Sequence, residues 1–487
     1  CCGSSIGIAQ GAGIGKYLAQ WMVHGDAEIN MHCVDPRRFG TYADPDYTRA
    51  KSFDDYENMF ETPLPEREVQ AGRPNRVTPL YEVLKARGAV YTEVYGWERP
   101  KYFAPEGFEE KLQYRRNNVF DIVGYVWRAV RERAGIMDLS SFAKFDVSGP
   151  GAEALLDHLT ANRLPKKPGG INLTHVLSDN GRIEGEWTIT RLAEDRFYVL
   201  SGAGTERMAL DQLAFAAGGD VTITNVTDDF GMLAVAGPKS RAVLAPLTNA
   251  DLSNAAFRWL SGQEIDIAGI PVRALRVNYV GELGWELHVP MAQLAELYSA
   301  IREAGEPHGI ADVGAQAVNS LRMEKGYRGY GAELTSEITL IEAGCTRFYA
   351  PDKGEFNGRA ATEAVREKGI ATKLVYGEVA AADCDIYGGE AVMQGDRVVG
   401  VCTSGGYGHM TGKSLAFAYV DPSVTSGLEA VILGERRALT LLDEPAWDPS
   451  NARQRHDRRH GIRTRHCGAL TLLDEPAWDP SNARQKA

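Results

Sequence analysis

Two glutamates in the segment G-R-I-E-G-E-W-T-I have a spacing that could support acid–base chemistry. Glu184 and Glu186 alternate with the apolar residues Ile183, Trp187 and Ile189. In a β-strand, both carboxylates would therefore share one face. Side chains two residues apart on a strand lie about 6.5 to 7 Å apart, so one carboxylate can raise the proton affinity of the other. The pattern predicts a proton acceptor, and the alternative is a solvated strand edge with two exposed acids.

A further acid, Glu286, lies in a segment with the pattern of a β-hairpin. Gly281 and Gly284 provide the backbone freedom that a tight reversal needs. Glu286 is predicted to project away from the apolar face, where it can meet a ligand or water. The alternative is a solvated glutamate on an ordinary hairpin. The alternating apolar residues are Leu275, Val277 and Tyr279 before the turn and Trp285, Leu287 and Val289 after it.

A helix is predicted within the segment N-S-L-R-M-E-K-G-Y-R-G-Y, residues 319–330. Gly326 is placed to end this helix, because glycine adopts the left-handed conformation of a helix cap. Arg322 lies on the helix, and one interpretation is a surface ion pair with Glu324 or Glu333. The residues expected on the buried side are Val318, Leu321 and the aliphatic part of Lys325.

The hairpin pattern Y-x-G-E-x-G-x-E followed by L-R-x-E-x-G-x-x-x-Y resembles the aminomethyltransferase (T-protein) superfamily of the glycine cleavage system. The resemblance implies that Tyr279, Glu286 and Arg322 hold the pterin of a folate. A pterin presents adjacent hydrogen-bond donors that one carboxylate can accept as a pair. Tyr330 is expected to line the same cavity, although a packed core tyrosine is equally compatible, and Glu282 is a further folate-binding candidate. Other similar segments begin at Phe142, Gly237 and Lys413.

The resemblance also implies which acid is catalytic. The corresponding turn in the family reads G-G-x-x-D-D and has a catalytic aspartate near folate N5 and N10. Its second acid aligns with Glu186, whereas Gly185 replaces the first, and glutamate is one methylene longer than aspartate. Glu186 is therefore the expected proton acceptor when tetrahydrofolate captures a one-carbon unit, an effect worth roughly 10²- to 10⁴-fold in rate.

Two upstream segments, G-W-E-R-P-K-Y-F-A from Gly96 and V-D-P-R-R-F-G from Val34, resemble dimethylglycine and sarcosine dehydrogenases. Those enzymes are flavoproteins fused to a folate domain, and their amino-terminal half is absent here. FAD is therefore expected only if that missing domain is supplied. By resemblance, three glycines form the last flavin-contacting loop before a helix over residues 16–23; the alternative is an ordinary glycine turn. These glycines are Gly11, Gly13 and Gly15.

Composition excludes several classes of function. The net charge of -12 disfavours sequence-independent binding to nucleic acid or to an anionic membrane. No apolar run reaches the length of a membrane span, so a soluble protein is expected. The seven cysteines are scattered without a C-x-x-C pair, which indicates a reducing compartment. With the resemblance, this favours the bacterial cytoplasm or the mitochondrial matrix. No metal site is expected, because the histidines near the carboxyl end lack zinc-ligand spacing.

The expected fold class is α+β, with a three-lobed T-protein-like fold, a small carboxyl-terminal β-barrel and a preceding remnant of a flavin oxidoreductase domain. The predicted divisions are a flavin-domain remnant at 1–40, a connecting segment at 41–114, a folate-binding domain at 115–365, a barrel at 366–454 and a duplicated tail at 455–487.

The tail contains a repeat. The segment A-L-T-L-L-D-E-P-A-W-D-P-S-N-A-R-Q begins at Ala438 and recurs letter for letter from Ala469. Solenoid repeats diverge in sequence and need at least ~3 units, so a recent duplication is the better interpretation. The residues between the copies are rich in Arg and His and are expected to be disordered. Together with a start at Cys1 inside what resembles a flavin domain, the repeat suggests a miscut or rearranged frame.

Three functions remain open from the sequence. The main expectation is the folate half of a dimethylglycine- or sarcosine-dehydrogenase-like enzyme that forms 5,10-methylenetetrahydrofolate, either truncated here or completed by a separate flavin-domain chain. The second is a stand-alone tetrahydrofolate-dependent methyl- or aminomethyltransferase. The third is a folate-binding regulator without catalysis.

Overall fold

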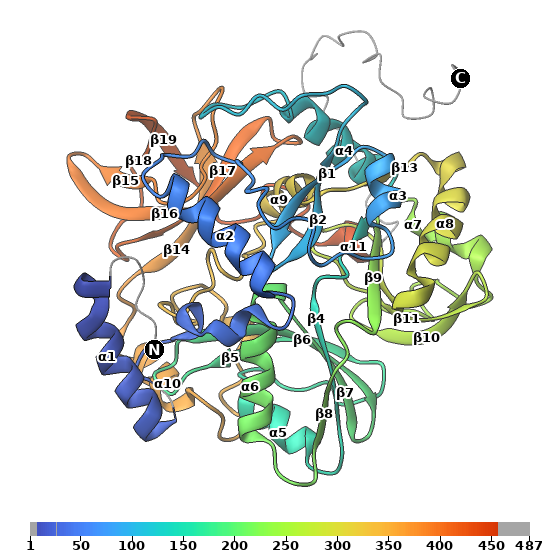
Figure 1. The fold of residues 1–487 in the computed structure, drawn as a ribbon, viewed down its shortest axis with the longest axis horizontal. Helices are drawn as coiled ribbons and strands as arrows, with labels where there is room; N and C mark the ends of the chain where they lie inside the picture. Colours follow the sequence, from blue (N-terminus) through green and yellow to red (C-terminus); the bar gives the residue numbers. More distant parts are fainter. Residues whose placement is uncertain (1–6, 26, 456–487) are drawn as a thin grey trace.

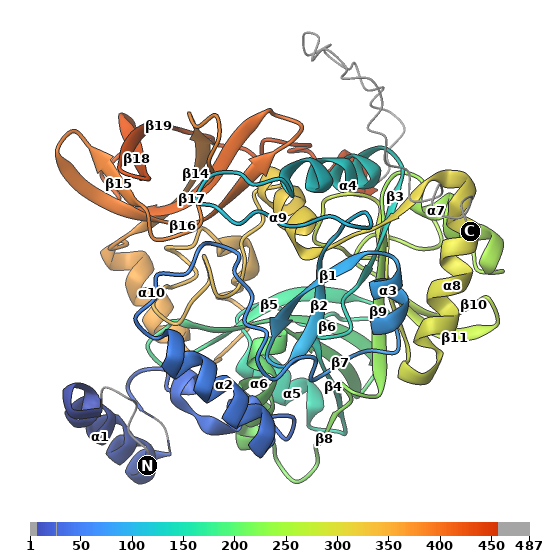
Figure 2. The same cartoon turned by 45° about the horizontal axis from the view of Figure 1, so that its top comes forward.

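The computed structural model describes residues 7–25 and 27–455, which form two large β-sheets, one two-stranded sheet and a closed barrel, with helices packed on them (Figure 1). The barrel and the two large sheets occupy three sides of the molecule. In that view the barrel lies at upper left, the five-stranded sheet at the bottom and the six-stranded sheet at right. α9 (Ala315–Glu324) contacts both the barrel and α4 (Phe120–Glu132), and Figure 2 shows it beneath α4. The predicted three-lobed α+β fold is confirmed.

The amino-terminal segment differs from its prediction. Gly11, Gly13 and Gly15 lie inside α1, so the expected loop before a helix over 16–23 is wrong. None has an atom within 4 Å of the position that a Cβ would take, and none has a positive φ. Amides inside a helix bond to the preceding turn, so these glycines offer no free amide cradle. This segment contains α1 (Gly7–His24), α2 (Pro45–Asn58), α3 (Tyr81–Ala86), β1 (Ala89–Val94) and β2 (Trp97–Phe103).

The first large sheet has the order β10-β11-β12-β9-β3-β13. α7 (Ser240–Leu244) and α8 (Leu294–Gly305) cover one face, where Trp285, Leu287 and Val289 are buried as the hairpin pattern predicts. The strands are β10 (Gly262–Ile267), β11 (Ile270–Leu275), β12 (Gly284–Pro290), β9 (Phe230–Ala236), β3 (Ala134–Asp138) and β13 (Ile310–Asp312).

The second sheet has the order β5-β6-β7-β4-β8. α5 (Ala152–Leu159) and α6 (Glu206–Ala216) pack on one face over an apolar core that contains Trp187 and Ile189. The predicted alternation in β6 is confirmed, because these residues are fully buried while Glu184 and Glu186 are not. The strands are β5 (Ile171–Leu177), β6 (Ile183–Ala193), β7 (Arg196–Ser201), β4 (Ala143–Ser148) and β8 (Thr222–Asn225).

The other faces of the two sheets meet at a small apolar cluster. Thr188 pairs with Leu200 across β6 and β7, and Leu275 pairs with Glu286 across β11 and β12. Residues paired across strands share a face, and alternate residues of one strand also share a face. Glu186 and Glu286 therefore lie on the two faces that meet at the cluster, which consists of Ile171, Tyr198, Leu200 and Leu275.

The predicted carboxyl-terminal barrel is confirmed as a closed barrel of the order β14-β17-β16-β15-β18-β19. Closure leaves no free sheet edge, and small apolar side chains such as Ala416, Ala418 and Val420 fill the interior. α10 (Arg359–Lys368) precedes it. The strands are β14 (Lys373–Val379), β15 (Ala391–Gln394), β16 (Arg397–Gly408), β17 (Lys413–Val420), β18 (Leu428–Ile432) and β19 (Glu435–Leu441).

After the barrel, the described chain runs back along the end of α9, and its last described element is α11 (Ala452–Arg455). The Trp447 amide donates to the Glu324 carbonyl at 2.9 Å, and Lys325 Nζ donates to the Asp448 carbonyl at 2.6 Å. The first copy of the repeated sequence supplies part of β19 and this returning segment. The second copy, from Ala469, and the Arg- and His-rich residues before it lie outside the described residues.

Candidate functional site

The hairpin motif forms a longer connection than its sequence predicts. β11 ends at Leu275 and β12 begins at Gly284, so Val277 and Tyr279 belong to a loop rather than to the first strand. Asn278 organises this loop: its Oδ1 accepts hydrogen bonds from the amides of Val280 and Gly281, and its Nδ2 donates to the Glu282 carbonyl. These side-chain bonds occupy backbone groups that would otherwise pair with a neighbouring strand, so the strand does not continue through this loop.

Glu286 is the acid that the fold leaves without a protein partner. Its side chain is 14% exposed, and no group in the described part of the chain donates a hydrogen bond to its carboxylate. Burial raises the pKa of this carboxyl to about 8. A buried carboxyl is expected to have hydrogen-bond partners, so Glu286 is a candidate for binding a ligand that carries donors.

His288 lies next to Glu286 on the same face of β12. The Tyr198 hydroxyl bonds to His288 Nδ1 at 3.2 Å, whereas the buried Nε2 has no hydrogen-bond partner and lies 3.9 Å from a Glu286 oxygen. Burial keeps the His288 pKa well below its ordinary value, and Lys144 and Arg273 add to this effect. The ring is therefore neutral, and its Nε2 faces Glu286.

Arg322 lies on α9, which ends as predicted. Gly326 has a φ of 60°, its amide bonds to the Met323 carbonyl, and the Tyr327 amide bonds to the Arg322 carbonyl, as in a Schellman motif. The Arg322 side chain is buried and pairs with Glu333 at 3.2 Å. The sequence alternative of an ion pair with Glu333 is thus present, but in the interior instead of on the surface.

The Arg322 guanidinium uses most of its donors inside the protein. It donates to Asn319 Oδ1 at 2.9 Å, to the Tyr327 carbonyl at 3.1 Å and to Ser404 Oγ at 2.9 Å, in addition to Glu333. Since a guanidinium has five N–H groups, about one remains for a ligand. Arg322 mainly connects α9, the loop after it and β16 of the barrel.

The two tyrosines attach that loop to the two sheets. The Tyr279 hydroxyl donates to the Arg328 carbonyl at 2.6 Å, and its ring stacks on Tyr327 with centroids 5.8 Å apart. The Tyr330 hydroxyl donates to the Glu184 carbonyl at 2.7 Å, which connects the loop to β6. Burial raises the pKa of the Tyr330 phenol, and the charges of Glu184 and Glu186 raise it further. Tyr330 therefore lies close to the predicted catalytic acid.

Glu186 is 24% exposed and lies opposite His175 in the β5–β6 register. Its Oε1 is 3.5 Å from His175 Nε2. Its charge also acts on Tyr279: loss of solvent raises the pKa of that phenol, Arg322 lowers it, and Glu186 raises it. The structure thus brings Glu186, Tyr279, Tyr330 and Arg322 into one region, and Glu286 faces the same interlayer space from the other sheet.

Glu282 has a different environment. It is 1% exposed and accepts hydrogen bonds from Arg131 at 3.0 Å and from Arg453 at 2.7 and 2.8 Å. Arg131 also bonds to Glu324 at 2.9 Å, so two guanidinium groups and two carboxylates form one buried, neutral network. These contacts use the Glu282 carboxylate within the protein and give it a structural role between the hairpin loop, α4, α9 and α11.

Sequence reasoning missed His175, His288 and the partners of Glu282. His288 could have been found by alternation, because it follows Glu286 by two residues and shares its face. His175 required the β5–β6 register. Arg131 and Arg453 are distant from Glu282 in the sequence, and no local signal connects them.

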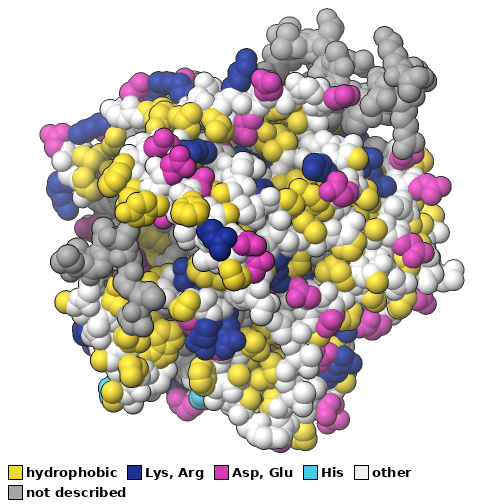
Figure 3. Space-filling view, viewed as in Figure 1, with side chains coloured by type: hydrophobic (Ala, Val, Ile, Leu, Met, Phe, Trp, Pro, Cys, Tyr) yellow, Lys and Arg dark blue, Asp and Glu magenta, His cyan; other side chains and the backbone are white. Residues whose placement is uncertain are grey.

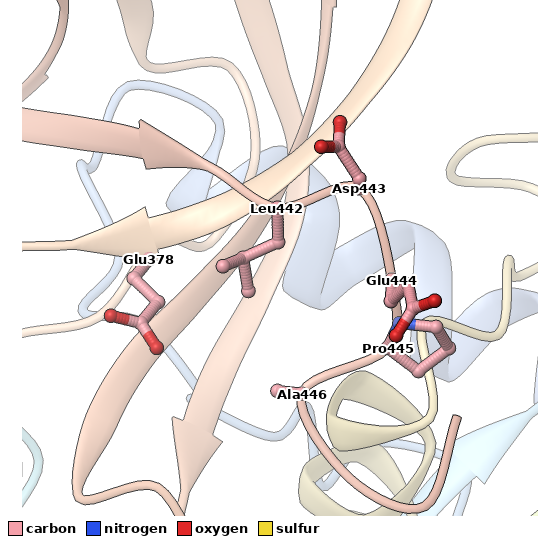
Figure 4. A pocket seen from close by; sticks show the side chains of 6 residues that line it. All are labelled: Glu378, Leu442, Asp443, Glu444, Pro445 and Ala446. Carbon is pink, nitrogen blue, oxygen red and sulfur yellow. The ribbon is translucent and has the colours of Figure 1, made fainter. Parts of the chain in front are cut away.

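A surface depression at the barrel edge does not match the predicted folate site. Figure 4 shows three acids around it, and Glu378 is paired with Lys413. An anionic folate would be repelled by this lining. The depression is lined by Glu378, Leu442, Asp443, Glu444, Pro445 and Ala446.

One face of the molecule shows how its charged side chains are distributed. On the face in Figure 3, basic and acidic side chains are interspersed and no large patch carries one sign. Within residues 7–25 and 27–455, no helix is long and apolar enough to span a membrane, and no group of three metal-ligating side chains is close enough to hold a metal ion.

Comparisons with known proteins agree with this fold. The family model described as "GCVT N-terminal domain" matches residues 80–353, the "Glycine cleavage T-protein C-terminal barrel domain" matches residues 373–448, and the "FAD dependent oxidoreductase central domain" matches residues 24–78. A crystal structure of glycine cleavage system aminomethyltransferase T from Bartonella henselae is 25% identical, with a TM-score of 0.67, and the match covers 77% of this chain and 98% of that one.

Two curated relatives differ in how much of their own length this chain covers. Mitochondrial dimethylglycine dehydrogenase of Mus musculus is 38% identical over 467 residues, which cover 93% of this chain and 54% of that protein. Aminomethyltransferase of Streptomyces coelicolor is 34% identical over 362 residues, which cover 73% of this chain and 92% of that protein. The chain thus spans about half the length of the dehydrogenase and nearly all of the transferase. It belongs to the aminomethyltransferase (glycine cleavage T-protein) family.

Proposed function

We propose that this chain binds a reduced folate between its two sheets and transfers a one-carbon unit to it. The observation that carries the proposal is the Glu286 carboxyl, which is nearly buried, has a pKa raised to about 8 and accepts no hydrogen bond from the described residues. A pterin offers the paired N–H donors that such a group lacks. Binding would therefore satisfy Glu286 and favour its charged form.

Each of the other site residues has a distinct part in this proposal. Glu186, on the opposing sheet, takes the proton that leaves the folate amine as the new nitrogen–carbon bond forms. Tyr279 and Tyr330 line the space between the two acids, and the remaining N–H of Arg322 can contact the ligand. Arg322 otherwise positions the loop that carries Tyr330, and Glu282 supports the hairpin loop.

The test measures binding and transfer separately. Titration calorimetry with tetrahydrofolate is expected to show binding that Glu286→Gln weakens strongly and Glu186→Gln leaves nearly unchanged. Stopped-flow capture of formaldehyde by tetrahydrofolate is expected to exceed the uncatalysed rate and to fall about 100-fold or more in Glu186→Gln. Absence of binding to the unaltered protein would overturn the proposal. Binding without any rate enhancement would support the non-catalytic regulator instead.

We also propose that the one-carbon unit comes from an N-methylated amine oxidised by a flavin domain, as in a dimethylglycine or sarcosine dehydrogenase. The match of residues 24–78 to an oxidoreductase central domain supports this partnership. So does the exposed apolar surface of the first two helices and the segment after them: Met22, Phe53, Tyr56 and Phe60 are 69 to 92% exposed. The residues of α1 do not fit a dinucleotide cradle, so we assign no flavin contact to Gly11, Gly13 or Gly15.

Two observations test this partnership. A flavin-binding domain encoded immediately upstream would support it, and visible flavin absorbance of the purified chain is expected to be absent until that domain is added. A stand-alone transferase would show full activity without any such domain. The compartment that fits this function is the bacterial cytoplasm or the mitochondrial matrix, and the mouse relative is a mitochondrial dimethylglycine dehydrogenase.

A further inference from the structure

His175 is a buried histidine whose ring has no hydrogen bond. It is 1% exposed, and both Nδ1 and Nε2 are without hydrogen-bond partners in the described structure. A buried polar group left in this state destabilises the folded protein, so a partner for the ring is expected. Its closest charged neighbour is Glu186, whose Oε1 lies 3.5 Å from Nε2, slightly beyond hydrogen-bond length.

The position of His175 follows from the strand register. His175 pairs directly with Glu186 across β5 and β6, so both side chains leave the sheet on the face that meets the other sheet. The Phe348 ring packs beside the imidazole with centroids 5.6 Å apart. Packing on one side and the strand on the other restrict the ring, which keeps Nε2 directed at the carboxylate.

The two buried histidines of the site differ in one respect. The Tyr198 hydroxyl contacts Nδ1 of His288, as donor or acceptor according to the tautomer of that ring. Nothing in the described structure occupies Nδ1 of His175. Glu186 offers the His175 ring an acceptor near Nε2, and a proton on Nε2 lets the ring donate to it.

We propose that His175 is a positioning residue that orients Glu186 during one-carbon transfer. This inference rests on the proposed function. While Glu186 is a carboxylate, His175 Nε2–H donates to Oε1 and leaves Oε2 for the folate amine. When the amine nitrogen bonds to the one-carbon unit, its N–H breaks and an O–H forms on Glu186. That proton then passes from Glu186, whose side chain is 24% exposed, to solvent, so Glu186 returns to carboxylate and His175 keeps its Nε2–H.

Other titratable groups surround this pair. Tyr279 and Tyr330 feel the charge of Glu186 from the hairpin loop and from the loop after α9. Cys345 does so from the chain that precedes Phe348: burial raises the pKa of its thiol to about 11, and Arg328 opposes that rise while Glu186 adds to it. The thiol and both phenols remain protonated near neutral pH, so they add no charge beside the Glu186–His175 pair in that range.

The experiment compares His175→Gln, His175→Asn and His175→Phe in the formaldehyde-capture assay. The amide nitrogen of Gln can reach the position of Nε2, whereas that of Asn reaches only the position of Nδ1. We expect kcat to fall about tenfold in His175→Phe and His175→Asn, with partial recovery in His175→Gln and little change in the tetrahydrofolate Kd. The pH profile of kcat is recorded for each variant, and we expect it to differ from that of the unaltered protein in His175→Phe and His175→Asn and to approach it in His175→Gln.

Three controls keep the result interpretable. His308→Gln, in a turn away from the site, should leave kcat and the pH profile unchanged, and thermal unfolding identifies any misfolded variant. Loss of activity in Glu186→Gln with an unchanged kcat and pH profile in all three His175 variants would overturn the inference and leave the proposed function standing. Full activity in Glu186→Gln would overturn the assigned role of Glu186 and this inference with it.

Discussion

Two acids of the same hairpin motif, Glu282 and Glu286, have opposite environments. Glu282 is sealed in the interior and held by Arg131 and Arg453. Glu286 is also nearly buried, but it accepts no hydrogen bond from the described residues, and its pKa is raised to about 8. One acid of the motif, Glu282, therefore holds the loop in place. The other, Glu286, lies on β12 and faces the space between the sheets.

This difference shows that burial alone does not reveal the function of an acid. What separates the two residues is whether the protein supplies partners. A buried acid that is paired with arginines inside the protein supports the structure. A buried acid that has lost its water without gaining a hydrogen-bond donor is available to bind a ligand. The same Glu→Gln change at the two positions should therefore change stability in opposite directions.

The largest effect is expected from Glu282→Gln. The change removes a negative charge from a network of two arginines and two glutamates, which leaves buried positive charge uncompensated. The free energy of unfolding should fall by about 3 to 5 kcal/mol, measured by urea denaturation at pH 7. Glu429→Gln, at an exposed ion pair with Arg436, is the matched control and should change it by less than about 1 kcal/mol. Equal losses at both positions would contradict the comparison.

Glu286→Gln should instead stabilise the protein at high pH. The folded-state pKa of about 8 lies above the ordinary value of 4.5, so the folded state binds the proton more tightly than the unfolded state. Wild-type stability from this group is therefore present below pH 4.5 and is lost as pH rises to 8. At pH 8 and above, the variant should be more stable by roughly 2 to 4 kcal/mol, and the two should converge at acidic pH. A variant less stable than wild type at pH 8 would show that Glu286 has a protein partner.

Ligand binding should depend on pH through the same residue. If pterin donors require the Glu286 carboxylate, the affinity for tetrahydrofolate should rise up to about tenfold per pH unit as pH approaches 8, and then level off. Lys144 titrates in a similar range, because burial lowers its pKa to about 7, and it acts on His288 beside Glu286. The Glu286→Gln variant separates the two contributions, because the affinity for tetrahydrofolate should no longer rise with pH in that variant. An unchanged slope would assign the pH dependence to Lys144.

Local pattern was sufficient for much of this architecture. Period-two alternation predicts that Glu186 and Glu286 turn away from the apolar cores that hold Trp187 and Trp285, and the strands confirm it. Gly326 ends α9 as its left-handed preference indicates, and frequent turns predict the closed barrel. In each case the prediction uses interactions between residues close in sequence, so a short segment of the amino-acid sequence is enough to make it.

Long-range partners could not be predicted in this way. Arg322 gives up most of its donors to Glu333 and Ser404, and Glu282 binds Arg453, which comes from the far end of the described chain. Those pairings depend on how the barrel and the returning segment pack, not on any local pattern. The helix over Gly11, Gly13 and Gly15 shows the converse error, since glycines suggest a turn even where a helix accommodates them.

The smallest effect is expected at Tyr279, in the loop that separates the two acids. Tyr279→Phe removes the hydroxyl that donates to the Arg328 carbonyl at 2.6 Å and should lower the free energy of unfolding by about 1 kcal/mol. Tyr91→Phe removes a similar bond, to the Tyr81 carbonyl at 2.7 Å, away from the site. Both changes should reduce stability alike, but only Tyr279→Phe should weaken tetrahydrofolate binding, by a few-fold in calorimetry. Equal affinity in the two variants would mean that the loop has only a structural role, together with Glu282. Glu286 would then bind its ligand without a contribution from Tyr279.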